Sequence, residues 1–288
     1  MRQWGCVLAL LVLLAVSSSA ATLTFVATGP EASGLSPLNE NPPHPTSSAI
    51  GTALVTWDTA TTMMALNVIF SGLTTPDIMA HIHCCTTTPS GNAGVATTVP
   101  SFPGFPLGVT SGTYAHTLDM LNAGSYNPAF VTAHGGTPSS AAAALLTGIL
   151  AGQAYVNIHT TMFPGGEIRG NLAIPVDISI KPEATPPVPI NAGSHGTIPV
   201  AIISTSTFNA VTSVMSSSLT FGRTGKEQSL AFCNTGGEDV NGDGLPDLVC
   251  HFETQSTGFQ TGDTLGILMG KTTQAATIIG QEAIVIVP

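Results

Sequence analysis

The chain has 288 residues and a formal net charge of −10, from 6 Lys and Arg against 16 Asp and Glu. Charged residues make up only 8% of it and hydrophobic residues 43%, which excludes a disordered chain and is enough for one or two folded cores. Because no basic stripe is present to neutralise phosphates, the composition argues against nucleic acid and anionic membrane surfaces as partners and favours cations.

The first 21 residues have the pattern of a secretory signal peptide. Arg2 precedes an apolar run over residues 6–16, and the small residues that follow indicate a cleavage site after Ala20 or Ala21. We therefore expect a secreted protein, located in a periplasm, at the cell surface or outside the cell. No later segment reaches the roughly 18 apolar residues that a spanning helix needs, so we expect no membrane insertion.

Strands are predicted in the segments that follow, because these segments alternate or are rich in β-branched residues and are bounded by Gly, Pro, Asn or Asp. They cover residues 22–28, 51–58, 63–73, 78–84, 112–120 and 154–161. This spacing is typical of an antiparallel sandwich. Between the last two strands, Pro128 after Asn127 and Pro138 after Thr137 predict two short helices that form a helical insertion.

A cluster of prolines near residue 174 marks a boundary, and a second series of strands follows it, from IPVAIIST to EAIVIV. The sequence thus predicts an all-β protein with two antiparallel β-sandwich-like domains, 22–173 and 174–288, the first of which carries the helical insertion. Few lysines guard the expected sheet edges, so self-association is a further expectation.

The first domain contains several separated motifs in a fixed order. They are PLNENPP at 37–43, GTALVTWD at 51–58, AHIH at 80–83, SGTY at 111–114 and AYVNIHTTMFPGGEIRGNL at 154–172. The series resembles the CHRD domain, a unit named from chordin that also occurs in secreted bacterial proteins. The resemblance implies an extracellular β-rich module without catalytic activity, and our first hypothesis is a secreted binding or structural protein. Its partner would be an extracellular protein or a matrix component.

The second domain is similar to a domain that recurs at the C-termini of secreted bacterial proteins, and this likeness implies no function. Within it, DVNGDGLPD matches a calcium loop, in which oxygen ligands alternate and a glycine permits the sharp turn. The candidate calcium ligands are Asp239, Asn241, Asp243, Leu245 and Asp247. Cys250 stands where an EF-hand has its bidentate glutamate, so Glu238, Glu253 or water would complete the shell. The alternative is an Asx-rich turn that binds no ion.

Four cysteines remain after removal of the signal peptide, and they allow three pairings. Cys233 and Cys250 flank the candidate calcium loop, and in an oxidising compartment a disulfide between them would clamp it, with a contribution of about 3 kcal/mol. Cys84 and Cys85 would then be bonded to each other or free.

Two histidine-bearing motifs of the first domain contain candidate ligands for copper or zinc. His81 and His83 are two residues apart in an expected strand, so their side chains share a face and can bind one ion together. His159 in the NIHT motif is the best candidate for a third ligand. Further candidates are His116, His134 and Glu167.

Two interpretations of these histidines stay open at the level of sequence. In the structural one, the imidazoles form hydrogen bonds across a sheet and hold the loop that follows it. In the other, the protein is a secreted copper- or zinc-binding protein with redox activity. The nucleophile elbow, the Walker loop, the HExxH motif and the dinucleotide fingerprint are all absent from the sequence, so no catalytic residue is predicted.

Overall fold

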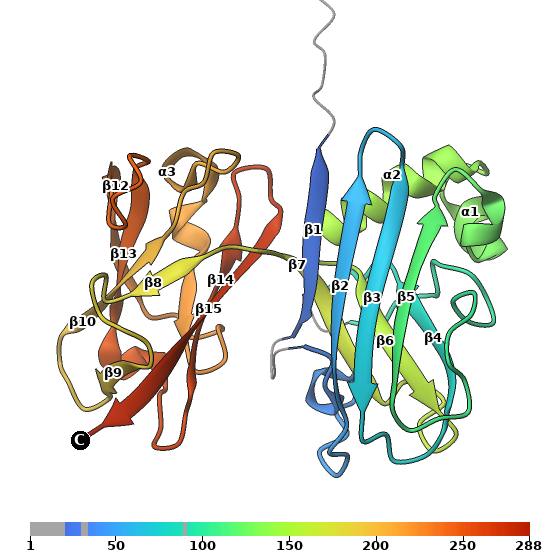
Figure 1. Cartoon of the computed structure of the whole chain (residues 1–288), viewed down its shortest axis with the longest axis horizontal. Coiled ribbons are helices and arrows are strands. Elements are labelled where there is room, and N and C mark those ends of the chain that lie inside the picture. The colour runs from blue at the N-terminus through green and yellow to red at the C-terminus, as the bar shows by residue number, and fades with distance from the viewer. Residues whose placement is uncertain (1–20, 30–33, 89–90) are drawn as a thin grey trace, which may run out of the picture.

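The computed structural model describes residues 21–29, 34–88 and 91–288. Nearly all of the predicted signal peptide lies outside these residues. Among the described residues, none of the helices combines the length and the apolar character that a membrane crossing requires. The chain is mostly β-structure, as the sequence predicts, and Figure 1 shows its two halves side by side, with β1 to β7 in one and β8 to β15 in the other.

The first half is a sandwich of two layers that share one strand. Its strands are β1 (Thr22–Thr28), β2 (Ile50–Asp58), β3 (Met63–Ser71), β4 (Asp77–His83), β5 (Gly112–Asp119), β6 (Tyr155–Thr160) and β7 (Ile168–Pro175). One layer runs β7-β1-β2-β3-β5, whereas β4 pairs with β6 and β6 with β7. Because β7 pairs with both β1 and β6, it joins the layers, and in Figure 1 β4 and β6 lie behind the front sheet.

All six predicted strands of this half form, each within two residues of its predicted ends. β2 and β3 bury alternate residues, such as Val55, Trp57 and Leu66, so one face of each strand packs on the core. β6 is different because every one of its residues is buried, which means that both of its faces are covered. The histidine of the NIHT motif therefore lies in the interior.

The predicted helical insertion also forms, as α1 (Pro128–Ala133) and α2 (Pro138–Leu150). Asn127 caps α1 by accepting from the backbone N–H of Ala129, and Thr137 forms a capping box with Ser140 at the start of α2. The buried face of α2 covers the core of the first half.

The second half has a hydrophobic core of its own. Its strands are β8 (Ile178–Ile180), β9 (Val188–Asn191), β10 (Thr197–Ile202), β11 (Thr220–Gly222), β12 (Leu230–Glu238), β13 (Asp247–Glu253), β14 (Leu265–Lys271) and β15 (Thr277–Val287). Its short helical segments are α3 (Ala210–Ser213), η3 (Ser216–Ser218) and η4 (Thr254–Thr257), and those of the first half are η1 (Pro37–Asn39) and η2 (Ala123–Ser125). One sheet runs β12-β13-β10-β8, and β11, β14 and β15 form the facing sheet.

Most pairings are antiparallel, but β15 pairs in parallel with β9 and with β7. The pairing with β7 joins Ile278 and Ile279 to Ile174 and Pro175, so one sheet runs through both halves at the residue where we expected the boundary. Sequence pattern could not show this contact because it depends on how the halves pack.

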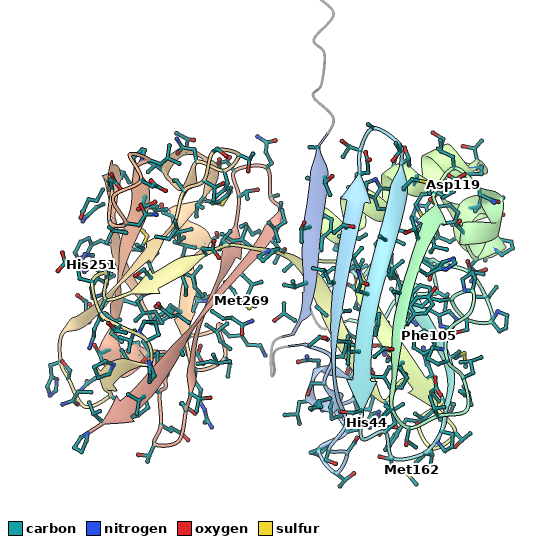
Figure 2. All side chains as sticks on the ribbon, viewed as in Figure 1. His44, Phe105, Asp119, Met162, His251 and Met269 are labelled. Carbon is teal, nitrogen blue, oxygen red and sulfur yellow. A yellow bond between two sulfur atoms is a disulfide. The ribbon has the colours of Figure 1, made fainter. Side chains whose placement is uncertain are left out.

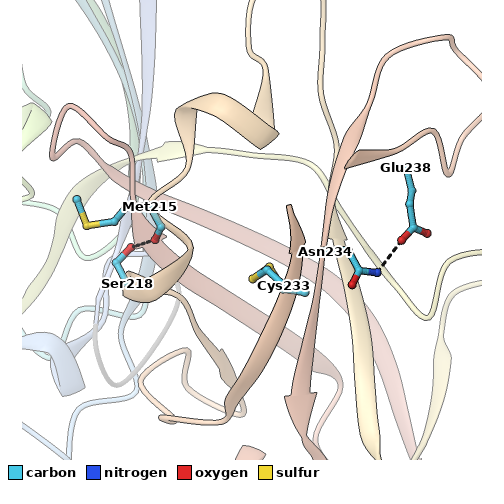
Figure 3. Close-up of a disulfide and its surroundings, with 6 residues drawn as sticks. Met215, Ser218, Cys233, Asn234 and Glu238 are labelled. Carbon is cyan, nitrogen blue, oxygen red and sulfur yellow. Dashed lines mark hydrogen bonds between the residues drawn. A yellow bond between two sulfur atoms is a disulfide. The ribbon is translucent and has the colours of Figure 1, made fainter. Parts of the chain in front are cut away.

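Each half contains one disulfide. Cys233 and Cys250 face each other on β12 and β13, beside the loop that they were predicted to clamp (Figure 3). Cys84 and Cys85 are bonded to each other directly after β4, which is one of the two states that the sequence left open. This second disulfide packs against Gly148 of α2, where a Cβ atom would overlap both sulfur atoms.

We expect Gly148→Ala to lower the free energy of unfolding by about 1–3 kcal/mol, because the added methyl group overpacks the contact with the disulfide. Gly165→Ala is the matched control, since a Cβ atom there meets nothing within 4 Å, and it should change stability by less than about 0.5 kcal/mol. Denaturant unfolding of both variants measures the difference. Equal stability of the two variants would show that α2 does not pack tightly on the disulfide.

Candidate metal centre

The three histidines that the sequence singled out lie together in the first half. His81 and His83 are on β4 and His159 is on β6, the strand that pairs with β4. Their exposed fractions are 1%, 8% and 4%, respectively. One ring nitrogen of each lies within 4.8 Å of those of the other two, and this is the only such group of His, Cys, Asp or Glu found among the described residues.

Each ring has one nitrogen bonded to a backbone carbonyl. His81 Nε2 lies 2.6 Å from the oxygen of Pro100, His83 Nδ1 lies 2.9 Å from that of Ala93, and His159 Nδ1 lies 3.1 Å from that of Pro164. A carbonyl oxygen can only accept a hydrogen bond, so each of these nitrogens carries the proton. In a neutral imidazole the other nitrogen is then a bare lone pair.

Among the described residues, no N–H or O–H group donates a hydrogen bond to the other nitrogen of these rings. His83 Nε2 and His159 Nε2 face each other at 3.3 Å, and His81 Nδ1 is buried without any hydrogen-bond partner. Two lone pairs at this distance repel unless a positive charge lies between them. Two nitrogens bound to one tetrahedral ion at 2.0–2.1 Å are about 3.3 Å apart, so the pair already has the spacing of metal ligands.

Burial keeps these imidazoles neutral. It lowers the pKa of His83 and of His159 to about 4, and it also lowers the pKa of His81. The positive forms of neighbouring histidines lower the values for His83 and His159 further, against the hydrogen bonds to the carbonyls, which raise them. At neutral pH the rings therefore offer lone pairs rather than protons.

The carbonyls of residues 93 and 100 are positioned by the segment that follows β4. Residues 93–102 run beside this strand: the N–H of Ala96 donates to the carbonyl of Ile82, and the hydroxyl of Thr97 accepts from the N–H of Ile82 at 2.9 Å. The segment thus covers the free edge of β4 and holds both oxygens against the histidine rings.

Glu167 positions the turn that carries the third carbonyl. Its carboxylate accepts from the backbone and hydroxyl of Thr74 and from the hydroxyls of Ser47 and Thr160, all at 2.7–2.8 Å. Burial raises its pKa, but these hydrogen bonds together bring it below the usual value. The carboxylate is therefore a charged anchor of the turn between β6 and β7, and it is not part of the histidine group.

The other two candidates lie elsewhere. His116 is exposed on β5 and stacks on Tyr114, and His134 lies beside Phe130 at the end of α1. His44 and Met162 are labelled at the lower end of the first half in Figure 2. There His44 packs on Phe163, with the ring centres 4.3 Å apart. None of these three histidines joins the group of His81, His83 and His159.

Two residues that sequence reasoning missed form a stack that begins on His83. The ring of Tyr155 stacks on His83 with centres 4.9 Å apart, and the guanidinium of Arg169 lies 3.9 Å from the centre of the Tyr155 ring. Arg169 is fully buried, and it donates to the side chain of Asn92 and the carbonyl of Gly91. Arg169 could have been found from the sequence, because a charged residue inside the strand motif EIRGNL is unusual.

Buried polar atoms without hydrogen-bond partners lie around this arginine. They are Arg169 Nε, Glu40 Oε1 and Asn157 Oδ1. The last two lie so close to Gly166 that a Cβ atom there would overlap both. Burial raises the pKa of Glu40 to about 8 although the positive charge of Arg169 opposes this, so the carboxyl is largely neutral at pH 7. The surroundings of the histidines are therefore polar, and the charged Arg169 lies close to the neutral carboxyl of Glu40.

The candidate calcium loop connects β12 to β13. The carboxylate of Asp239 accepts from the backbone N–H groups of Gly242, Asp243 and Gly244, as in an Asx-rich turn. Asp247 is fully buried and accepts from the N–H groups of Ser204 and Val240. These hydrogen bonds hold the loop in its conformation, and its calcium binding stays a prediction.

Comparison with protein families gives one match, the CHRD domain, over residues 32–172. This range includes all three histidines, Glu40 and Arg169, and it supports the resemblance that we drew from the motifs of the first half. The comparisons found no significant match among curated proteins and none among solved structures.

The metal-free protein should lose stability as the pH falls from the usual histidine pKa of 6.5 toward about 4. Because the folded-state pKa of these histidines is lowered, the unfolded chain binds more protons in this window, and each such proton removes about 1.4 kcal/mol per pH unit. Denaturant unfolding of the chelator-treated protein at several pH values measures the slope. The variant His159→Gln should show a shallower slope, whereas an equal slope would mean that His159 is not buried as a neutral ring.

Proposed function

We propose that this protein is an extracellular binding protein whose CHRD-type domain holds one copper or zinc ion between His81, His83 and His159. The observation that supports the proposal is a group of three buried imidazoles, with one ring nitrogen of each within 4.8 Å of the others, in which every ring also donates from one nitrogen to a backbone carbonyl. This outer hydrogen bond is the usual partner of a metal-binding histidine, because it fixes the tautomer and the ring orientation.

A purely structural role accounts less well for the same contacts. Histidines that hold a sheet together by hydrogen bonds would direct an N–H toward an acceptor on the neighbouring strand. Here the nitrogens that face across the sheet belong to His83 and His159, and both are acceptors once their other nitrogens donate outward. His81 Nδ1 adds a buried acceptor without a donor, which a metal ion would satisfy.

The proposed role is to bind the ion and also to bind an extracellular protein or matrix component through the surface of the CHRD-type domain. The family match and the two disulfides support an extracellular setting, since disulfides persist in oxidising compartments. No Asp, Glu or Cys among the described residues joins the group of three histidines, and we propose no reaction.

The exported protein, purified without chelators, should contain about one equivalent of copper or zinc by elemental analysis. The double variant His81→Ala/His83→Ala should contain less than about a tenth of this amount, because two of three ligands are gone. His116→Ala is the matched control, since His116 is exposed on β5, and it should keep the full metal content. Metal-free wild-type protein that also fails to take up either ion from solution would contradict the proposal.

We propose that the loop 239–247 binds calcium weakly, with a Kd on the order of 10⁻⁴ M, as in other extracellular modules. The alternating oxygens of Asp239, Asn241 and Asp243 and the positive φ of Gly242 and Gly244 support this. Millimolar calcium should raise the melting temperature of the wild type and not that of Asp243→Ala. An equal response of both proteins, or none, would leave the loop as a turn.

A further inference from the structure

The group of His81, His83 and His159 contains no negatively charged donor. No Asp, Glu or Cys joins the three histidines within the described part of the chain. The nearest cysteines by sequence, Cys84 and Cys85, form a disulfide and so offer no thiolate. A bound ion would therefore keep its whole charge, because three neutral imidazoles contribute none.

A buried positive charge lies one aromatic ring away from the site. Arg169 is fully buried, and its guanidinium lies 3.9 Å from the centre of the Tyr155 ring, which stacks on His83. The hydrogen bonds of its guanidinium go to the neutral acceptors Asn92 and Gly91, and the one ion pair among the described residues lies in the second half, between Arg223 and Asp263. No carboxylate thus neutralises Arg169 at contact distance.

This electrostatic setting discriminates by ionic charge. The free energy lost on moving an ion out of water grows with the square of its charge, and repulsion by Arg169 is twice as large for a divalent as for a monovalent ion. Proteins that bury divalent zinc offset its charge with thiolates or carboxylates, or they leave a fourth position open to water. Here the three rings are almost completely removed from solvent.

We infer that the site formed by His81, His83 and His159 is selective for Cu(I) over Zn²⁺ and Cu²⁺. Cu(I) is the common biological transition-metal ion with a single charge, and it is stable with only three ligands. The inference rests on the proposed function, because it concerns the identity of the ion that the same histidines hold.

The test is to measure the affinity of the metal-free full-length protein for each ion under anaerobic conditions. Bicinchoninate serves as the competitor for Cu(I), and a chromogenic chelator serves for Zn²⁺ and Cu²⁺. We expect the Cu(I) affinity to exceed the Zn²⁺ affinity by at least about 100-fold, with both lost in His81→Ala/His83→Ala. Tighter binding of Zn²⁺ or Cu²⁺ at these histidines would overturn the inference and leave the proposed function intact.

Arg169 provides a second test that depends on its charge. Arg169→Gln should reduce the ratio of Cu(I) to Zn²⁺ affinity by about tenfold, because the divalent ion gains more from removal of a positive neighbour. Arg169→Lys keeps the charge and should keep the ratio, and circular dichroism verifies that both variants fold. An unchanged ratio in folded Arg169→Gln would overturn the electrostatic argument. If the wild-type measurement finds no affinity for any of the three ions, the proposed function itself fails.

Discussion

The candidate site depends on three hydrogen bonds from imidazole N–H groups to backbone carbonyls. Each carbonyl uses the single proton of a neutral ring, so the other nitrogen of that ring must present a lone pair. If any ring turned over, the site would contain an N–H group in place of a ligand. The carbonyls belong to Ala93, Pro100 and Pro164, none of which lies on the strands that carry the histidines. The chemistry of the site is therefore determined by the segments that cover the sheet.

The fold holds those segments by polar contacts as well as by buried apolar residues such as Ala96 and Phe102. Residues 93–102 act as an irregular extra strand along the edge of β4, where the side chains of Thr97 and Ser101 accept from its backbone. The turn after β6 is held by the buried carboxylate of Glu167. Such networks are stable only when nearly every member is satisfied. The unsatisfied atoms are then informative, and several of them, on His81, Glu40, Asn157 and Arg169, gather at or near the site.

Sequence pattern was enough to predict the strands of the first half and the capped helices, because these depend on local spacing. Alternation along a strand places His81 and His83 on one face, and the motif order suggested His159. The carbonyl partners, the stacking of Tyr155 and the burial of Arg169 depend on contacts between distant segments, so they could not be read from spacing. Glu167 was a further candidate as a ligand or as a partner of the ligands, and its hydrogen bonds direct it to Thr74 and Ser47. The pairing of Cys84 with Cys85 stayed open because connectivity does not follow from a count of cysteines.

We expect the lone pairs of all three rings to point inward in the metal-free protein. Long-range ¹H–¹⁵N correlation spectra of the chelator-treated protein at pH 7 report which nitrogen of each histidine carries the proton. We expect the Nε2–H tautomer for His81 and the Nδ1–H tautomer for His83 and His159, and the resonances of the unprotonated nitrogens should shift when an ion is added. A protonated Nδ1 on His81, or a protonated Nε2 on both His83 and His159, would contradict this expectation.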